Sequence, residues 1–400
     1  MANRYLKPES PWLLALLAAL VALGPLSVDM YLPAMPMMMR ALDTDIGQMH
    51  LTLSSYLTGF ALFHLVCGPL ADRYGRKPVL VAGTLVFVAA CIGCAQSTTV
   101  EELLVFRFLQ GAGGCVGPTL ARTVARDIFG PRDAARALSL IAMLMALAPA
   151  VAPTLGGFVL LVLPWPVIFI FLACYGLLMI FLLQVYLGES LPQRQSLHPL
   201  NIGRNYARLI TDLPYLSVTV ASALIYAGLM AYLSSASFVY IEMLGVPVQY
   251  FGFIFLTTVV GYMAGSATSA RMASRYDSRQ SMLLGALLCL LTTSIMWLGA
   301  SLAPSSIWVL MLPMVLYAIG MGLLLPNAMA IALAPFPKIA GTASALLGFI
   351  QMGVSALATA LVGAVLSDSP QPMLAAMFGA TLGSCALALL AFRQHRHTQA

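Results

Sequence analysis

The sequence predicts an all-α integral membrane protein in which twelve transmembrane helices form two pseudo-symmetric six-helix bundles. Of its 400 residues 60% are apolar and only 8% are charged, whereas a soluble domain is about half apolar and about a quarter charged. Apolar stretches of the roughly 20 residues that span a bilayer recur along the whole chain. A polar stretch in the middle divides six of them from six, which predicts two bundles.

The apolar stretches define the predicted spans in order. None alternates polar and apolar residues as a transmembrane β-strand does, so each is predicted to be a helix. The spans are expected near residues 12–36, 48–69, 78–97, 101–125, 135–160, 164–187, 214–240, 249–270, 281–301, 305–330, 338–366 and 371–392.

The basic residues predict the orientation of these spans. Arg73, Arg132, Arg204 and most other basic residues lie near the termini or in loops that follow even-numbered spans, and Arg40 is the one basic residue in the opposite loops. Loops rich in Lys and Arg stay in the cytoplasm, so both termini are predicted to be cytoplasmic. Because this bias also accounts for the net charge of +6, we expect a protein surrounded by the lipid bilayer and no nucleic-acid partner.

The chain has the organisation of a duplicated unit. The predicted bundles cover residues 1–187 and 214–400, and residues 188–213 form a cytoplasmic linker between them. The segment GPRDAARALS before span five matches FPKIAGTASA before span eleven in the placement of proline, a basic residue and alanines. Many secondary transporters are built from such repeats and hold their substrate between the halves.

The cysteines do not indicate a metal site. All seven lie within or at the edges of apolar spans, and the CxxC formed by Cys91 and Cys94 has no second pair of ligands near it. Buried apolar cysteine is the favoured interpretation. We therefore expect no metal and no cofactor.

The loop between spans two and three carries the most specific motif. GPLADRYGRKP (68–78) resembles the signature loop of the major facilitator superfamily, G-x-L-(A/S)-D-R-x-G-R-(R/K). Asp72 and Arg76 are one helical turn apart and can pair. The resemblance implies more: Asp72, Arg73 and Arg76, together with Asp127 at the end of span four, would form a conformational latch that favours the outward-facing state.

Span five contains a second motif. ALAPAVAPTLGG (146–157) resembles the antiporter signature of the superfamily's drug exporters, in which a proline and small residues recur. Pro153, Gly156 and Gly157 match it, while alanines stand where two glycines are usual. Proline removes a helix hydrogen bond and kinks the chain. With Pro149, these residues are predicted to form a gating helix, although a kinked packing helix has the same pattern.

Two charges are predicted to lie deep in the membrane. Asp29, in SVDMYLP, is a few residues from the outer end of span one, and Arg107 is about equally far from the outer end of span four. A charge at such depth is costly, and pairing or protonation lowers the cost. We expect an ion pair between them, with Asp29 as the proton carrier. A fixed bridge that only ties two helices together is the alternative.

SVDMYLP also resembles the D-x-Y-L-P element of the bicyclomycin/chloramphenicol-resistance branch of drug:proton antiporters, and residues 238–252 resemble its span-seven-to-eight region. The resemblance covers nearly the whole chain and implies a monomer of the bacterial inner membrane. It would export small amphipathic drugs by alternating access, driven by the proton gradient. His64 stands where many relatives have a polar amide; it could hydrogen-bond a neighbouring helix or titrate as a second group.

A pocket for varied drugs should be broad and apolar, which suits a chain with 23 Met and 18 Phe. Each candidate for this pocket also has a purely structural interpretation. The candidates are Tyr31, Tyr56, Phe60, His64, Tyr226, Met230, Asn327 and Gln351.

Three other functions are alternatives to drug export. The same fold could export one metabolite, such as an amino acid or a sugar derivative. An embedded enzyme would need several titrating groups at one level, whereas only Asp29, Arg107 and His64 are predicted to lie deep. A channel would need a ring of polar groups along a pore, and the sequence indicates none.

Overall fold

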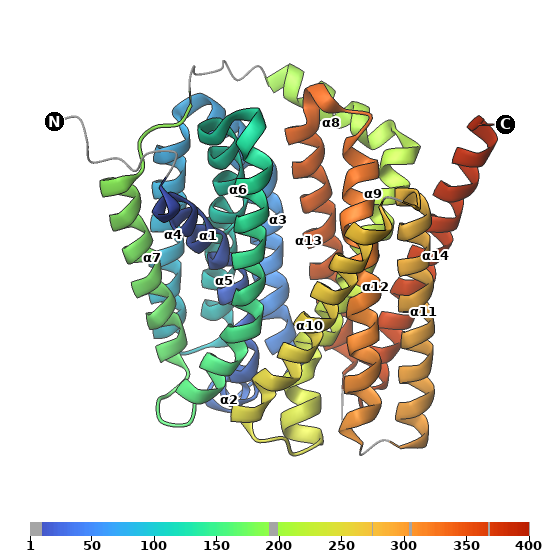
Figure 1. Cartoon of the computed structure of the whole chain (residues 1–400). Coiled ribbons are helices and arrows are strands. Elements are labelled where there is room, and N and C mark those ends of the chain that lie inside the picture. Colours follow the sequence, from blue (N-terminus) through green and yellow to red (C-terminus); the bar gives the residue numbers. More distant parts are fainter. Residues whose placement is uncertain (1–9, 192–198, 274, 304–305, 367–368, 400) are drawn as a thin grey trace. The chain divides into compact units, whose positions relative to one another are not determined.

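The computed structural model describes residues 10–191, 199–273, 275–303, 306–366 and 369–399. These residues form helices and no strands (Figure 1). The contacts divide the chain into two units, one of Met1–Thr44 with Ser55–Pro199, the other of Asp45–Ser54 with Leu200–Ala400.

The first unit contains most of the first eight elements. They are α1 (Pro11–Asp29), η1 (Leu32–Ala34), α2 (Met35–Ala41), α3 (Ile46–Tyr74), α4 (Arg76–Gln96), α5 (Val100–Gly114), α6 (Val116–Val159) and α7 (Pro166–Tyr186).

The second unit contains the remaining elements and the first turns of α3. They are α8 (Pro199–Thr211), α9 (Leu213–Ser237), the π-helix η2 (Phe238–Met243), α10 (Val248–Met272), α11 (Ser278–Leu302), α12 (Ile307–Leu333), η3 (Pro337–Ile339), α13 (Ala340–Val365) and α14 (Gln371–Gln399).

Eleven stretches of the described residues are long and apolar enough to cross a membrane. The predicted fifth span lies inside α6, where Ala148–Val159 forms a shorter apolar helix. α6 also runs through the loop expected between spans four and five. The side chains of the repeat segment 130–139 lie outside the described residues.

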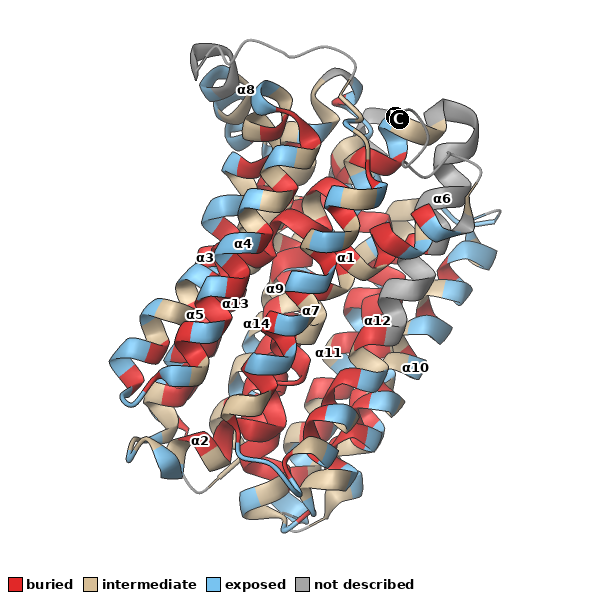
Figure 2. Ribbon diagram, turned by 90° about the vertical axis from the view of Figure 1, so that its left-hand side faces the viewer, coloured by how far each residue is buried: buried red, intermediate tan, exposed pale blue. Residues whose placement is uncertain are grey.

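Apolar side chains cover the outer surface of the helices. In α4, Leu85, Val86 and Ile92 are each more than 40% exposed, while Phe87 and Cys91 on the opposite face are buried. Figure 2 shows the same division of exposed and buried faces along other helices. Exposed apolar area of this extent marks a membrane-facing surface. The prediction of an all-α membrane protein is confirmed.

Glycines bring α5 close to its neighbours in the first unit. A Cβ on Gly59 of α3 would collide with the backbone oxygen of Phe108, and one on Gly111 of α5 would collide with the backbone oxygen of Tyr56. Gly113 packs in the same way on the backbone of α4. The GAGG run of α5 is thus a helix-packing segment, and it places Arg107 in the interior of the unit.

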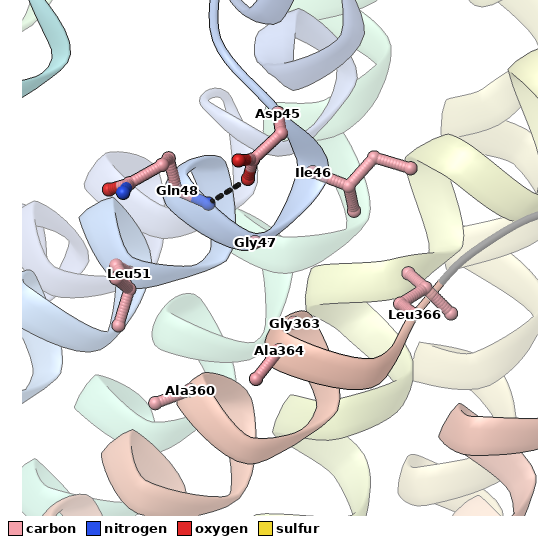
Figure 3. A pocket seen from close by; sticks show the side chains of 9 residues that line it. All are labelled: Asp45, Ile46, Gly47, Gln48, Leu51, Ala360, Gly363, Ala364 and Leu366. Carbon is pink, nitrogen blue, oxygen red and sulfur yellow. Dashed lines mark hydrogen bonds between the residues drawn. The ribbon is translucent and has the colours of Figure 1, made fainter.

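The first turns of α3 pack on α13 within the second unit. Ser54 donates its hydroxyl proton to the backbone oxygen of Ala356 at 2.6 Å, and His50 Nδ1 lies 3.3 Å from that of Thr359. Beside this contact, nine residues line a hollow of about 480 Å³ (Figure 3). At its rim, the Asp45 carboxylate accepts the Gln48 backbone N–H at 2.8 Å and caps α3.

Candidate functional site

Arg107 is the centre of a buried polar cluster, the Arg107 site. Its side chain is fully buried in α5. Its Nη1 donates to Gln110 Oε1 at 2.6 Å and to the backbone oxygen of Ser27 in α1 at 3.2 Å. Gln110 is itself positioned by Cys91 of α4, because its Nε2 donates to the Cys91 sulfur at 3.1 Å. Helices α1, α4 and α5 therefore all contribute to holding one guanidinium.

Two aromatic rings pack against the Arg107 guanidinium. Its central carbon lies 4.1 Å from the ring centroid of Tyr31 and 4.5 Å from that of Tyr56. Cation–π contacts of this kind are worth more where water is excluded. Both tyrosines are buried, and Tyr56 donates its hydroxyl proton to the backbone oxygen of Gly24 at 3.4 Å. The rings thus form part of the wall of the Arg107 site.

The other edge of the guanidinium has no partner among the described residues. Arg107 Nε and Nη2 are buried and have no hydrogen-bond acceptor there. Within the same residues, the ion pairs involve Arg76 and neither of them includes Arg107. Buried donors are nearly always satisfied, and arginine cannot shed its charge. A buried cation in this condition is therefore an exception that calls for a functional explanation.

Asp29 is not the ion-pair partner of Arg107, and that prediction is wrong for this structure. Asp29 ends α1 and is only 5% exposed. Tyr31, two residues further along, faces Arg107. Among the described residues, Arg107 Nε and Nη2 have no hydrogen-bond acceptor, and neither ion pair includes Asp29. The prediction compared only the depth of Asp29 and Arg107 in the membrane, and equal depth does not determine whether the two side chains point toward each other.

The chain is irregular directly after Asp29. Regular helix ends there, and a turn and the 3₁₀-helix η1 follow, with Pro25 before and Pro33 after the break. Gly156 of α6 packs against this segment, because a Cβ there would lie 2.8 Å from the backbone oxygen of Met30. The predicted gating helix thus contacts the break beside Asp29. Its role in gating remains a prediction.

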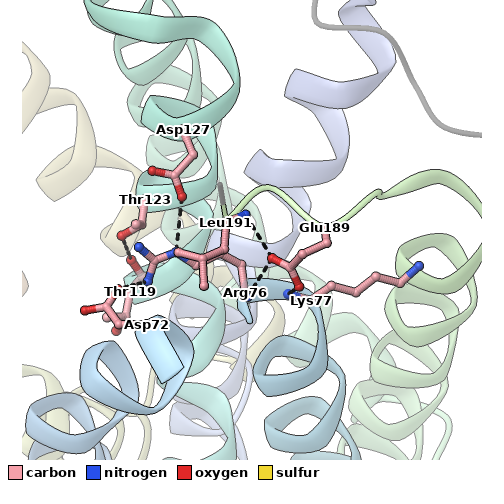
Figure 4. A network of polar contacts seen from close by, with 8 residues as sticks. All are labelled: Asp72, Arg76, Lys77, Thr119, Thr123, Asp127, Glu189 and Leu191. Carbon is pink, nitrogen blue, oxygen red and sulfur yellow. Dashed lines mark hydrogen bonds and ion pairs between the residues drawn. The ribbon is translucent and has the colours of Figure 1, made fainter. Parts of the chain in front are cut away.

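Three of the four predicted latch residues, Asp72, Arg76 and Asp127, come together near the point where α3 ends and α4 begins (Figure 4). Arg76 forms ion pairs with Asp72 at 2.6 Å and with Asp127 at 3.1 Å, and so joins α3, α4 and α6. The expected Asp72–Arg76 pair is confirmed. Arg73 instead lies over the ring of Tyr74, 5.2 Å from its centroid. The function of this Arg76 cluster as a latch remains a prediction.

Glu189 is a member of the Arg76 cluster that the sequence did not reveal. Its carboxylate accepts the backbone N–H groups of Arg76 at 2.9 Å and of Lys77 at 3.3 Å (Figure 4). It thereby caps the N-terminus of α4, where a negative charge is favourable. Gly75 has φ of 108° there, and a Cβ on it would collide with the Glu189 carboxylate. An acid at the end of span six was the available signal, but nothing local tied it to α4.

The pocket candidates of the first unit form a ladder along α3. The ring of Phe60 lies 6.3 Å from that of Tyr56 and 5.8 Å from that of His64. Thr119 Oγ1 of α6 is 3.1 Å from His64 Nδ1, which is the structural interpretation of His64 considered above. The ladder leads from the Arg107 site to this contact.

The candidates of the second unit are less closely connected. Asn327 donates to Ser269 Oγ and to the backbone oxygen of Leu323, both at 2.7 Å, and so joins α12 to α10. Met230 is buried, and Tyr226 and Gln351 are partly buried. None of these four residues lines the hollow of Figure 3. Their contact with substrate remains a prediction.

A multi-pass helical membrane protein with a buried guanidinium and a proline-flanked buried acid is typical of secondary transporters rather than enzymes. The chain belongs to the Major Facilitator Superfamily, whose family model matches residues 17–359. It is 30% identical to the bicyclomycin resistance protein homolog of Haemophilus influenzae over 92% of each chain. It is 28% identical to multidrug resistance protein D of Escherichia coli over 96% of this chain and 97% of that one.

Solved structures have the same fold. The structure of a mutant of the nucleoside transporter NupG matches with a TM-score of 0.76 at 16% identity, covering 95% of this chain and 99% of that one. The xylose transporter XylE from E. coli matches with a TM-score of 0.72 at 12% identity, covering 96% and 97%. The expected superfamily and fold are confirmed. This chain is a membrane transporter of small molecules.

Proposed function

We propose that this chain exports small amphipathic drugs across the bacterial inner membrane in exchange for protons. The observation that carries the proposal is Asp29, a buried acid at the end of α1 beside an irregular, proline-flanked segment. Intramembrane acids are functional by default. The relatives named for bicyclomycin and multidrug resistance support drugs as the substrate. The distribution of basic residues supports a cytoplasmic location of both termini.

In the proposed cycle Asp29 carries the proton and Arg107 provides a constant charge. A carboxylate can lose its charge by binding a proton, whereas a guanidinium cannot. When the site opens outward, a proton binds to Asp29 and the drug leaves. The protein turns inward, Asp29 releases the proton to the cytoplasm, and the next drug binds. The membrane potential contributes about 2.3 kcal/mol per charge for each 100 mV.

The motion takes place around the break after Asp29. Met30 lies against Gly156, so a shift of the gating part of α6 moves the segment next to the proton carrier. The Arg76 cluster holds α3, α4 and α6 together where α3 ends and α4 begins, an end of the first unit that faces the cytoplasm in this proposal. Breaking and re-forming that cluster accompanies each turnover in this proposal.

The experiment measures drug-driven proton release in proteoliposomes that contain the full chain. Wild type is expected to release protons on drug addition, and Asp29→Asn is expected to lose this release. Asp43→Asn is the matched control, because Asp43 is an acid outside the buried interior with φ of 47°, a conformation that asparagine tolerates. Unchanged coupling in Asp29→Asn would remove Asp29 from the mechanism. If the chain transported a single metabolite and no unrelated drug, the proposed substrate class would be wrong and the chain would be a metabolite exporter.

A further inference from the structure

The unpartnered edge of Arg107 has a defined chemical shape. The N–H group of Nε and one N–H of Nη2 point in the same direction, as the two prongs of the guanidinium fork. Nη1 already donates to Gln110 and Ser27, so the guanidinium is held in place while the fork has no acceptor. Such a fork binds a planar group with two acceptor oxygens by two parallel hydrogen bonds.

No group of the described first unit pairs with the fork. Asp29 forms no ion pair among the described residues, and the acids Asp72 and Asp127 are engaged by Arg76. Leaving buried charged donors unsatisfied is costly. A protein can retain unsatisfied donors where they bind a ligand, because the acceptors of the bound ligand then satisfy them and offset the free-energy cost. The surrounding tyrosines would accommodate an apolar or aromatic body next to the acceptor.

We propose that the Nε–Nη2 fork of Arg107 is a substrate-binding site for amphipathic molecules that present a carboxylate or a similar planar pair of acceptor oxygens. The site disfavours cationic amphipaths, because the guanidinium keeps its positive charge throughout the cycle. This inference rests on the proposed export function and names the substrate class of that site. In this proposal the Arg107 fork binds the substrate and Asp29 carries the proton, so substrate binding and proton transport depend on different side chains.

The test uses three ligands of nearly equal shape: 2-naphthoate, 2-naphthamide and 2-naphthamidine. They present two acceptor oxygens, one acceptor oxygen, and a cationic group with none. Binding to the purified full chain in detergent is measured by equilibrium dialysis. Wild type should bind the naphthoate roughly tenfold or more tightly than the amide, the gain expected from hydrogen bonds to a charged group, and the amidine most weakly.

Arg107→Lys separates the fork from the charge, because lysine keeps the charge and loses the planar pair of donors. We expect its preference for naphthoate over naphthamide to fall to about threefold or less. Asp43→Asn, which changes an exposed acid outside the Arg107 site, should keep the wild-type order of the three ligands. Wild-type binding of the amidine as tight as that of the naphthoate would overturn the inference, and so would a full naphthoate preference in Arg107→Lys.

The wild-type order decides the matter even where Arg107→Lys fails to fold. The failure of the inference and that of the proposed function are also distinguishable. If drug addition releases no protons but the ligand order holds, antiport is wrong and the fork assignment stands. If protons are released but the three ligands bind equally, the fork assignment is wrong and antiport stands.

Discussion

Replacing Asp29 by asparagine tests the geometry of the Arg107 site most directly. If Asp29 and Arg107 formed a fixed buried ion pair, breaking it would cost about 3–5 kcal/mol of stability. Among the described residues Asp29 has no ion-pair partner, and Arg107 is held by Gln110 and Ser27. Asp29→Asn, which conserves shape, should therefore change the free energy of unfolding by less than about 1 kcal/mol.

The measurement is a double-mutant cycle of unfolding in detergent with Asp29→Asn, Arg107→Gln and the double variant. Arg107→Gln alone should cost about 1.5–3 kcal/mol, because it removes a charge-assisted hydrogen bond to Gln110. The coupling energy should lie below about 0.5 kcal/mol, as for residues that do not interact. Asp43→Asn serves again as the control. A coupling energy above about 1 kcal/mol would refute this description of the site and restore the ion pair.

Two glycines give further predictions, with Gly68→Ala as their common control because nothing lies within 4 Å of its added Cβ. Gly75→Ala should lower the free energy of unfolding by about 1–3 kcal/mol, since φ is 108° there, a conformation almost restricted to glycine, and the Cβ meets Glu189; a thermal melt no different from that of Gly68→Ala would contradict this. Gly156→Ala should slow drug transport in proteoliposomes several-fold with little loss of folded protein, because its Cβ would lie 2.8 Å from the backbone oxygen of Met30; wild-type transport would show that this contact does not matter for the cycle.

The sequence predicted those features that depend on local spacing or bulk composition. The spans follow from apolar runs, and the Asp72–Arg76 pair follows from a separation of four residues on one helix. Each of these is decided within a few residues of the chain, so no tertiary information was needed.

Features that depend on the rotation of one helix against another were missed. Depth along the membrane placed Asp29 and Arg107 at one level, but the structure sets the Tyr31 ring and the backbone oxygen of Ser27 against the guanidinium, and no ion pair with Asp29 forms. Similarly, Glu189 caps α4 across 113 positions of sequence. The sequence alone does not determine how each helix is rotated about its axis or which distant residues meet, because both depend on the packing of whole helices.

The cap that Glu189 places on α4 has a practical consequence for dividing the chain into separately expressed halves. A fragment that stops at Leu187, where the last apolar span of the first half ends, would lack the carboxylate that binds two backbone amides at the start of α4. Cutting beyond Leu191, whose own amide also donates to Glu189 at 3.0 Å, keeps that corner intact. The six-helix half thus extends past its final membrane crossing.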